Sequence, residues 1–418
     1  MFKTIFLLLF IIAVIKKAAL TVLNYRHMKK NKGNVPKEIE EAVDVQKLKK
    51  IDAYNSDKMR FSIITLIVNS FLTGIFIFSP LFPAYTDFVS GISGNFIANG
   101  IIFFLLLSFI FTILELPLSF YSTFVIEARH GFNRYSKAGW AADQLKSLLL
   151  SSFLTALILG ILFFITGETV SFHIPGIFLL WGVLSALILF FAFIAPVLFI
   201  PLFYKLRPLK DTELSESVNK LVKQSGYRIK RLFEADESKK SSHANAAFTG
   251  LGKSRTVILF DTLISKFSRE EIIAVLAHEI GHGKKGHMKK KTAGGLLLLF
   301  IFIVFSAWML SGNAIYSSFG IKEQLFAAVF LLQIFFFDTI SFFFNQIFSG
   351  ISRKHEYEAD EYAVSLTGKP KVFISFLKKI ASEELSNIHP HPLYMRFFYS
   401  HPPLVSRIKR IREVFDVR

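Results

Sequence analysis

Residues 274–303, AVLAHEIGHGKKGHMKKKTAGGLLLLFIFI, join two features that favour opposite surroundings. The first half places His278 and His282 four residues apart, a spacing typical of metal ligands on one face of a helix. The second half is apolar enough to enter a lipid bilayer. The stretch therefore predicts a polar site built directly beside a membrane-spanning helix.

The whole chain has the composition of an α-helical integral membrane protein. Hydrophobic residues make up 52% of its 418 residues, and Phe occurs 49 times. The apolar residues gather in blocks that are long enough to cross a bilayer. Lys16 and Lys17 interrupt the first block, so a signal peptide is the alternative there; in a retained helix they must snorkel or face a wet interior. Seven spans are predicted, at 2–25, 61–83, 98–123, 147–166, 176–203, 292–311 and 324–349.

The positions of the basic residues predict the orientation. The net charge is +18, and Lys and Arg crowd the loop 26–60, whereas the connections 84–97 and 167–175 have none. Because cytoplasmic loops carry the excess of basic residues, we expect the amino terminus outside and the carboxyl terminus in the cytoplasm. The charge thus suits a lipid bilayer, and neither nucleic-acid binding nor an obligate protein partner is expected.

The polar segments 204–291 and 350–418 would then lie on the same cytoplasmic side. The two-span hairpin 292–349 separates them in sequence, and 1–203 holds the first five spans. We expect the polar segments to form one split domain. The chain has no cysteine, so any zinc must be held by His, Asp or Glu.

The helix with the two histidines is predicted to begin at Ser268, because Ser268 and Glu271 form a capping-box pattern. His278 and His282 lie one turn apart, so their imidazoles can bind one ion. Glu279 follows the first of them, where it can take a proton from water.

After this pair, Gly281 and Gly283 predict a weak helix end. His287 follows, and we expect it to be a solvated loop histidine, although it and His355 could compete as ligands.

A catalytic zinc needs a third protein ligand, and SRKHEYEADEYAV (352–364) offers four carboxylates. Glu356 and Asp360 lie one turn apart, so one could bind metal while the other orients a ligand histidine. The spacing favours Glu356 as the ligand without settling the choice. An acidic helix start is the structural alternative.

Six motifs occur in order along the chain: FVIEARHGFNRYS (124–136), PLFYKLRPLKDTEL (201–214), SSHANAAFTGLGKSRTVILFDTLI (241–264), AVLAHEIGHGKKGH (274–287), SRKHEYEADEYA (352–363) and YSHPPLVSRI (399–408). Through these motifs the chain resembles the type I CAAX prenyl proteases, a family of integral-membrane zinc endopeptidases. Its length and its Phe- and Lys-rich composition suggest a bacterial homologue.

The resemblance implies one Zn²⁺ held by His278, His282 and Glu356, with Glu279 as general base and Asp360 beside a ligand. It also implies a substrate-binding edge strand in HANAAFTG, at Asn245 and Ala246. His401 and Arg407 would lie near the metal, stabilising an oxyanion or positioning substrate; from the residues alone a capping histidine and an exposed arginine are as plausible.

The fold implied by the resemblance is a barrel of seven membrane helices around a hydrated chamber, with a split gluzincin-like domain on the cytoplasmic side. Asn69, Glu115 and Glu127 lie in or beside spans and fit a wet lumen. The expected partner is a peptide or protein substrate, prenylated or unmodified, at the inner membrane of a bacterium or the endoplasmic reticulum of a eukaryote. A quality-control protease of the heat-shock zinc protease type is the alternative, and a transporter or inactive scaffold is a third.

Overall fold

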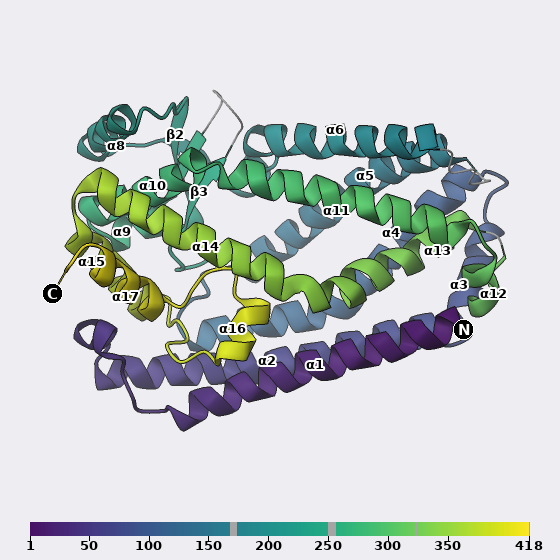
Figure 1. Ribbon diagram of the computed structural model, residues 1–418, viewed down its shortest axis with the longest axis horizontal. Coiled ribbons are helices and arrows are strands. Elements are labelled where there is room, and N and C mark those ends of the chain that lie inside the picture. Colours follow the sequence, from purple (N-terminus) through teal and green to yellow (C-terminus); the bar gives the residue numbers. More distant parts are fainter. Residues whose placement is uncertain (168–173, 250–255, 323, 418) are drawn as a thin grey trace.

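The structure is a computed structural model that describes residues 1–167, 174–249, 256–322 and 324–417. Long helices run along the longest axis of the molecule, and a small sheet and several short helices gather at one end (Figure 1). The two chain termini lie at opposite ends. Within these ranges seven helices are long and apolar enough to cross a membrane, as the sequence predicts.

The spans extend beyond their apolar segments. The span after η1 (Lys37–Ala42), for example, begins where the Asp44 side chain accepts a hydrogen bond from the Lys47 amide, well before residue 61. The last span likewise continues to Thr367 instead of ending near residue 349. The helices are α1 (Phe2–Lys30), α2 (Val45–Phe78), α4 (Phe96–Tyr121) with the π-helical turn η2 (Ser122–Glu127), α5 (Lys137–Thr166), α6 (Ile174–Leu198), α11 (His287–Leu310), and α13 (Leu325–Gln333) joined through the π-helical turn η4 (Ile334–Ile340) to α14 (Ser341–Thr367).

Short helices connect the spans at the end that holds the amino terminus. Residues 79–83, which the sequence assigns to the second span, fall in a bend and in the start of α3 (Leu81–Ser90), and α12 (Ala314–Phe319) follows α11. Phenylalanine rings, among them Phe6, Phe82 and Phe103, pack there as one buried cluster.

The sheet at the opposite end has the strand order β1-β2-β4-β3. The strands are β1 (Leu206–Pro208), β2 (Arg231–Ala235), β3 (Ala246–Thr249) and β4 (Thr256–Phe260). Every residue of β4 is buried, as its apolar sequence TVILF favours. Among the described residues, strand β3 pairs antiparallel with β4 alone, so its other edge has no partner strand there.

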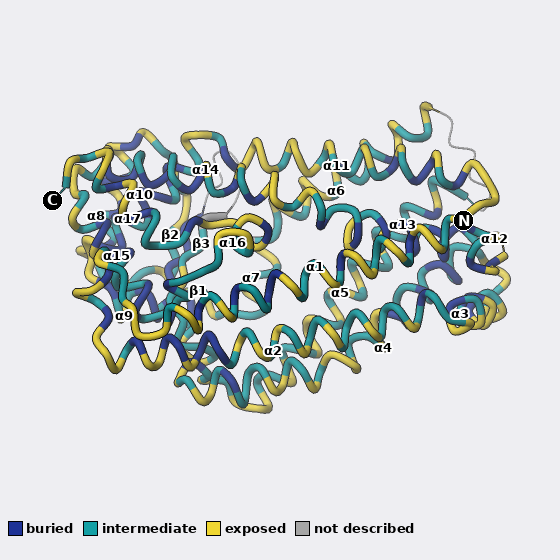
Figure 2. Tube along the Cα trace, turned by 60° about the horizontal axis from the view of Figure 1, so that its bottom comes forward, coloured by how far each residue is buried: buried dark blue, intermediate teal, exposed yellow. Residues whose placement is uncertain are grey.

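One hydrophobic cluster joins both polar segments of the chain. It contains Leu214 of α8 (Thr212–Ser225), Leu263 of α9 (Asp261–Lys266), Leu276 of α10 (Arg269–Lys284), Phe373 of α15 (Pro370–Glu383) and Ile408 of α17 (Leu404–Val414). Figure 2 shows that buried positions are dense at this end and that exposed positions are frequent along the spans. Many of the exposed residues on the spans are apolar. Exposed apolar residues on helices of this length fit contact with lipid.

The helices α1, α2, α4 and η4 border a cavity of about 710 Å³. Polar side chains line it, including Asn69 and Glu115, whose amide and carboxylate lie 3.4 Å apart. Lys17 also faces this cavity and donates to the Asp338 carbonyl at 3.3 Å. Lys16 lies over the ring of Phe397 of α16 (Pro392–Phe398), 4.3 Å from its centroid. Both lysines of the first span thus have polar or aromatic surroundings instead of lipid.

Candidate metal centre

Helix α10 begins with the predicted capping box. The Ser268 hydroxyl accepts from the Glu271 amide at 3.3 Å, and the Glu271 carboxylate accepts from the Ser268 amide at 2.9 Å. Ser375 and Lys379 of α15 also donate to Glu271, which fastens the two helices together. Burial raises the pKa of Glu271, but the bonds from Ser268, Ser375 and Lys379 outweigh it and lower that pKa below its usual value.

Gly281 and Gly283 lie in the last turn of α10, which ends at Lys284, close to where the glycines predict a helix end. Close packing against neighbouring segments explains why both positions are glycine. A Cβ added at Gly281 would lie 3.1 Å from the Cα and carbonyl oxygen of Ala359 in α14, and one at Gly283 would overlap the Tyr227 ring. The backbones of α10 and α14 therefore meet at Gly281. The side chains next to this contact converge on one point.

That point lies among His278, His282 and Glu356. The two Nε2 atoms are 3.1 Å apart, and they lie 3.4 Å and 3.3 Å from the two Glu356 carboxylate oxygens. Ligand atoms bound to one tetrahedral zinc would be separated by about 3.3 Å, given bonds of roughly 2.0–2.1 Å. The three groups therefore fit a metal ion, and the described residues hold no other group of this kind.

Asp360 turns away from this point. Its carboxylate lies 2.8 Å from Nδ1 of His278, and it accepts from Nε and a terminal nitrogen of Arg407 at 2.7 Å and 2.5 Å. Arg407 is only 9% exposed, so the exposed arginine of the structural alternative is wrong. Burial lowers the pKa of Arg407, but Asp360 more than offsets this and raises it. Asp360 thus supports the face of His278 that points away from Glu356.

The electrostatics favour a cation. Burial lowers the pKa of His278, but its hydrogen bonds to Asp360 and Glu356 raise it to about 9. A metal ion and a proton therefore compete for this site, because a ligand imidazole must be neutral. His401 adds a further nitrogen, 2.9 Å from a Glu356 oxygen, on a side chain that is 66% exposed. Glu279 is partly buried beside His278 on α10.

His287 is not the solvated loop histidine that the sequence suggests. It is the first residue of α11 and is 1% exposed. Its Nδ1 lies 3.0 Å from Nδ1 of His282, and its Nε2 lies 3.0 Å from Glu358. Gly286, with φ of 69°, turns the chain so that this histidine folds back onto α10. The glycine immediately before His287 was the available sequence signal.

The predicted edge strand lies where its block of sequence suggests, although residues 250–255 of that block fall outside the described residues. Asn245 precedes β3, and its carbonyl accepts from the Phe260 amide of β4 at 3.3 Å. Antiparallel partners alternate, so the amide of the next residue, Ala246, faces the open edge. The exposed Asn245 side chain accepts a hydrogen bond from that amide at 2.8 Å.

Comparison with known proteins identifies relatives along the whole chain. Residues 24–205 match the model of the CAAX prenyl protease N-terminal region with five membrane helices, and residues 208–415 match peptidase family M48. CAAX prenyl protease 1 of Saccharomyces cerevisiae is 31% identical, with 94% of this chain and 92% of the relative covered. The CAAX prenyl protease 1 homolog of Arabidopsis thaliana is 33% identical, with 90% of each covered.

A solved structure agrees with this assignment. The crystal structure of S. mikatae Ste24p superposes with a TM-score of 0.90 at 31% identity and covers 98% of both chains. The fold, the group of two histidines and a glutamate, and the matches along both halves point the same way. The chain belongs to peptidase family M48 and is a multi-pass membrane metalloprotease of the CAAX prenyl protease 1 type.

Proposed function

We propose that His278, His282 and Glu356 hold one zinc ion and that Glu279 is the general base for peptide-bond hydrolysis. The mutual approach of the three ligand atoms carries this proposal. Two imidazoles and a carboxylate, with a fourth position left for water, are the donor set of catalytic zinc. Zinc supplies a Lewis acid there and lowers the pKa of water.

The side chains around the ligands would transfer protons, stabilise the oxyanion and orient a ligand histidine. Glu279 takes a proton from the attacking water and delivers it to the leaving amine. His401, exposed and close to Glu356, is available to donate to the oxyanion that forms on the scissile carbonyl. Arg407 is buried against Asp360, so it acts by holding Asp360 against His278.

The substrate would bind as an added strand on β3. Its open edge presents main-chain groups, which pair with an extended peptide without reading side chains. Asn245 and Ala246 would take part, because the Ala246 amide faces outward and donates a hydrogen bond to the Asn245 side chain. A bound peptide would displace that side chain.

We further propose that the substrates are membrane-associated peptides cleaved near a lipid-modified carboxyl terminus, such as prenylated CAAX sequences. The site adjoins the span α11 and includes Glu356 of α14, which is the end of the last span, and a polar-lined cavity lies between the spans. Segments 204–291 and 350–418 form one split protease domain that shares a hydrophobic cluster. This domain faces the cytoplasm, because the termini lie at opposite ends and the basic loops share one side.

The experiment uses Glu279→Gln in the full chain, reconstituted in lipid nanodiscs with zinc. The variant should bind zinc as the wild type does and lose cleavage of a reporter peptide, because the ligands remain and the base is removed. Cleavage at the wild-type rate would refute the role of Glu279. Mass-spectrometric mapping of products from prenylated and unprenylated forms of one peptide tests the substrate class. Equal cleavage of both forms would refute a requirement for the lipid.

A further inference from the structure

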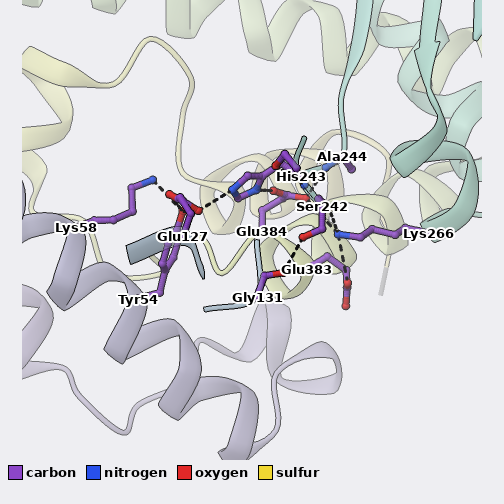
Figure 3. Close-up of polar contacts among 11 residues, drawn as sticks. Tyr54, Lys58, Glu127, Gly131, Ser242, His243, Ala244, Lys266, Glu383 and Glu384 are labelled. Atoms are coloured by element: carbon purple, nitrogen blue, oxygen red, sulfur yellow. Dashed lines mark hydrogen bonds and ion pairs between the residues drawn. The ribbon is translucent and has the colours of Figure 1, made fainter. Parts of the chain in front are cut away.

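His243 lies just before β3 and is held between two carboxylates from distant parts of the chain. Its Nδ1 is hydrogen-bonded to Glu384, which follows α15, and its Nε2 lies 3.2 Å from Glu127, at the end of the third span (Figure 3). Ionised carboxylates only accept hydrogen bonds, so both ring nitrogens must carry a proton. The geometry therefore requires a charged imidazolium at this position.

The surroundings support that charge. The ring stacks on Phe132 with centroids 4.0 Å apart, and the side chain is 35% exposed. Burial lowers the pKa of His243, but the hydrogen bonds to Glu127 and Glu384 raise it to about 9. Other ionisable groups around this arrangement are Tyr54 and Lys58 of α2, Lys266 of α9, Glu383 of α15 and Glu237 of η3 (Glu237–Lys239), which interacts electrostatically with His243.

The residues beside His243 are fastened to the same elements. The Ala244 amide donates to Glu384 at 2.9 Å, which places two bonds on one carboxylate. The Ser242 amide donates to the Phe132 carbonyl at 3.0 Å, and the Ser242 carbonyl accepts from Lys266 at 2.5 Å. We call residues 242–244 and their partners Glu127, Phe132, Lys266 and Glu384 the anchor. It ends two residues before β3 begins at Ala246, so it sets the direction in which the chain enters the strand.

Glu127 is itself tied to the membrane helices. The Tyr54 hydroxyl of α2 lies 2.9 Å and 3.1 Å from its two oxygens, and Lys58 donates to that hydroxyl at 3.2 Å. Glu127 belongs to the same continuous span as α4. The anchor thus joins the open strand to the ends of two spans, and it includes none of the metal-binding side chains.

We propose that His243 is a positioning residue for substrate: as an imidazolium between Glu127 and Glu384, it holds the start of β3 at a fixed place relative to the membrane helices, so that the outward main chain at Ala246 meets a peptide that arrives from the bilayer. This inference rests on the proposed role of β3 in binding substrate. Because the anchor is separate from the metal ligands, it acts on substrate binding and leaves the chemical step unchanged.

The test compares His243→Gln with the wild type as full chains in nanodiscs loaded with zinc. Glutamine keeps one donor but no charge, and charge-assisted hydrogen bonds are roughly twice as strong as neutral ones. We expect KM for a reporter peptide to rise about tenfold while kcat changes less than about twofold. His389→Gln is the matched control, since that histidine bonds the Asn34 carbonyl at 2.8 Å and does not contact the anchor. Its KM should stay at the wild-type value.

A pH series separates positioning from a general structural role. The pKa of His243 is raised by the fold, so the anchor is complete at neutral pH and is lost as the pH rises through about 9. The wild-type KM should rise across that pH, and the KM of His243→Gln should not. A variant with wild-type KM, or one with the same pH dependence as the wild type, would overturn the proposal. So would a fall in kcat alone.

A modified substrate distinguishes failure of the anchor from failure of the proposed strand addition at β3. N-methylation of one main-chain amide in the peptide removes a donor to an added strand, so it should raise the wild-type KM and affect His243→Gln less. If N-methylation at successive positions leaves the wild-type KM unchanged, β3 does not bind substrate and the proposed strand addition fails. If it raises KM equally in both proteins, the strand binds substrate and only the anchor fails.

Discussion

Gly281→Ala tests whether the contact between α10 and α14 sets the geometry of the metal site. The added Cβ would lie 3.1 Å from two backbone atoms of Ala359 and 3.2 Å from the ring of Tyr362. Carbon atoms prefer separations of about 3.5–4.0 Å, so the helices must part by roughly half an ångström. Backbone atoms cannot rotate out of the way, so the whole helix has to shift.

The energetic cost follows from two opposing effects. Overpacking of this kind costs about 1–3 kcal/mol. Replacing a glycine inside a helix by alanine returns about 1 kcal/mol. The net loss of stability is therefore small, up to about 2 kcal/mol. The metal site is more sensitive, because α10 carries His278 and His282 while α14 carries Glu356, and half an ångström is about a quarter of a metal–ligand bond.

We therefore expect Gly281→Ala to bind zinc about 10–100-fold more weakly. Mutations of the residues that orient a metal ligand typically lower metal affinity by this factor. Competition with a chromophoric chelator measures this affinity, and thermal unfolding of the metal-free protein measures stability. Gly294→Ala is the matched control, since its added Cβ would meet no described atom within 4 Å beyond its chain neighbours and the adjacent backbone of its own helix. Equal zinc affinity and unfolding temperature in both variants would refute the reasoning.

Three further substitutions test other contacts. His287→Ala removes the neighbour of His282 Nδ1, so zinc affinity should fall about 10–100-fold in chelator competition, and an unchanged value would contradict the contact. Glu271→Gln should cost about 0.5–2 kcal/mol in denaturant unfolding at pH 7. The lowered pKa of Glu271 means that its contribution is present at neutral pH and lost as the pH falls below its ordinary value, so the difference from wild type should shrink at pH 3. Arg407→Lys cannot form both bonds to Asp360, so zinc affinity should fall without loss of fold, and wild-type affinity would show that the paired bonds are dispensable.

The membrane helices could be predicted because apolar composition is a property of each segment by itself. Their ends could not, since the extensions are polar. The second span begins at Val45 and the last one ends at Thr367, in sequence that has no apolar signal. Helical spacing likewise placed Glu356 and Asp360 on one face but could not tell which of them meets the histidines. That choice depends on the packing of α14 against α10.

Residues whose surroundings come from distant segments were the hardest to interpret. Gly281 has the sequence signature of a weak helix, and only the backbone of Ala359 explains it. The sequence around His287 is typical of a loop. Its contact with Glu358, which lies far away in the chain, appears only in the folded structure. His243 is the extreme case, because both its carboxylate partners are more than a hundred residues away.

The direct continuity between the ligand helices and the spans makes the site responsive to the lipid around it. Only Lys285 and Gly286 separate α10 from α11, and α14 is the end of the last span. Spans tilt when acyl chains become shorter than their apolar length. A tilt of α11 against α14 would move the two imidazoles relative to Glu356. In bilayers of graded thickness, zinc affinity and turnover should therefore share one optimum and decline together on either side of it.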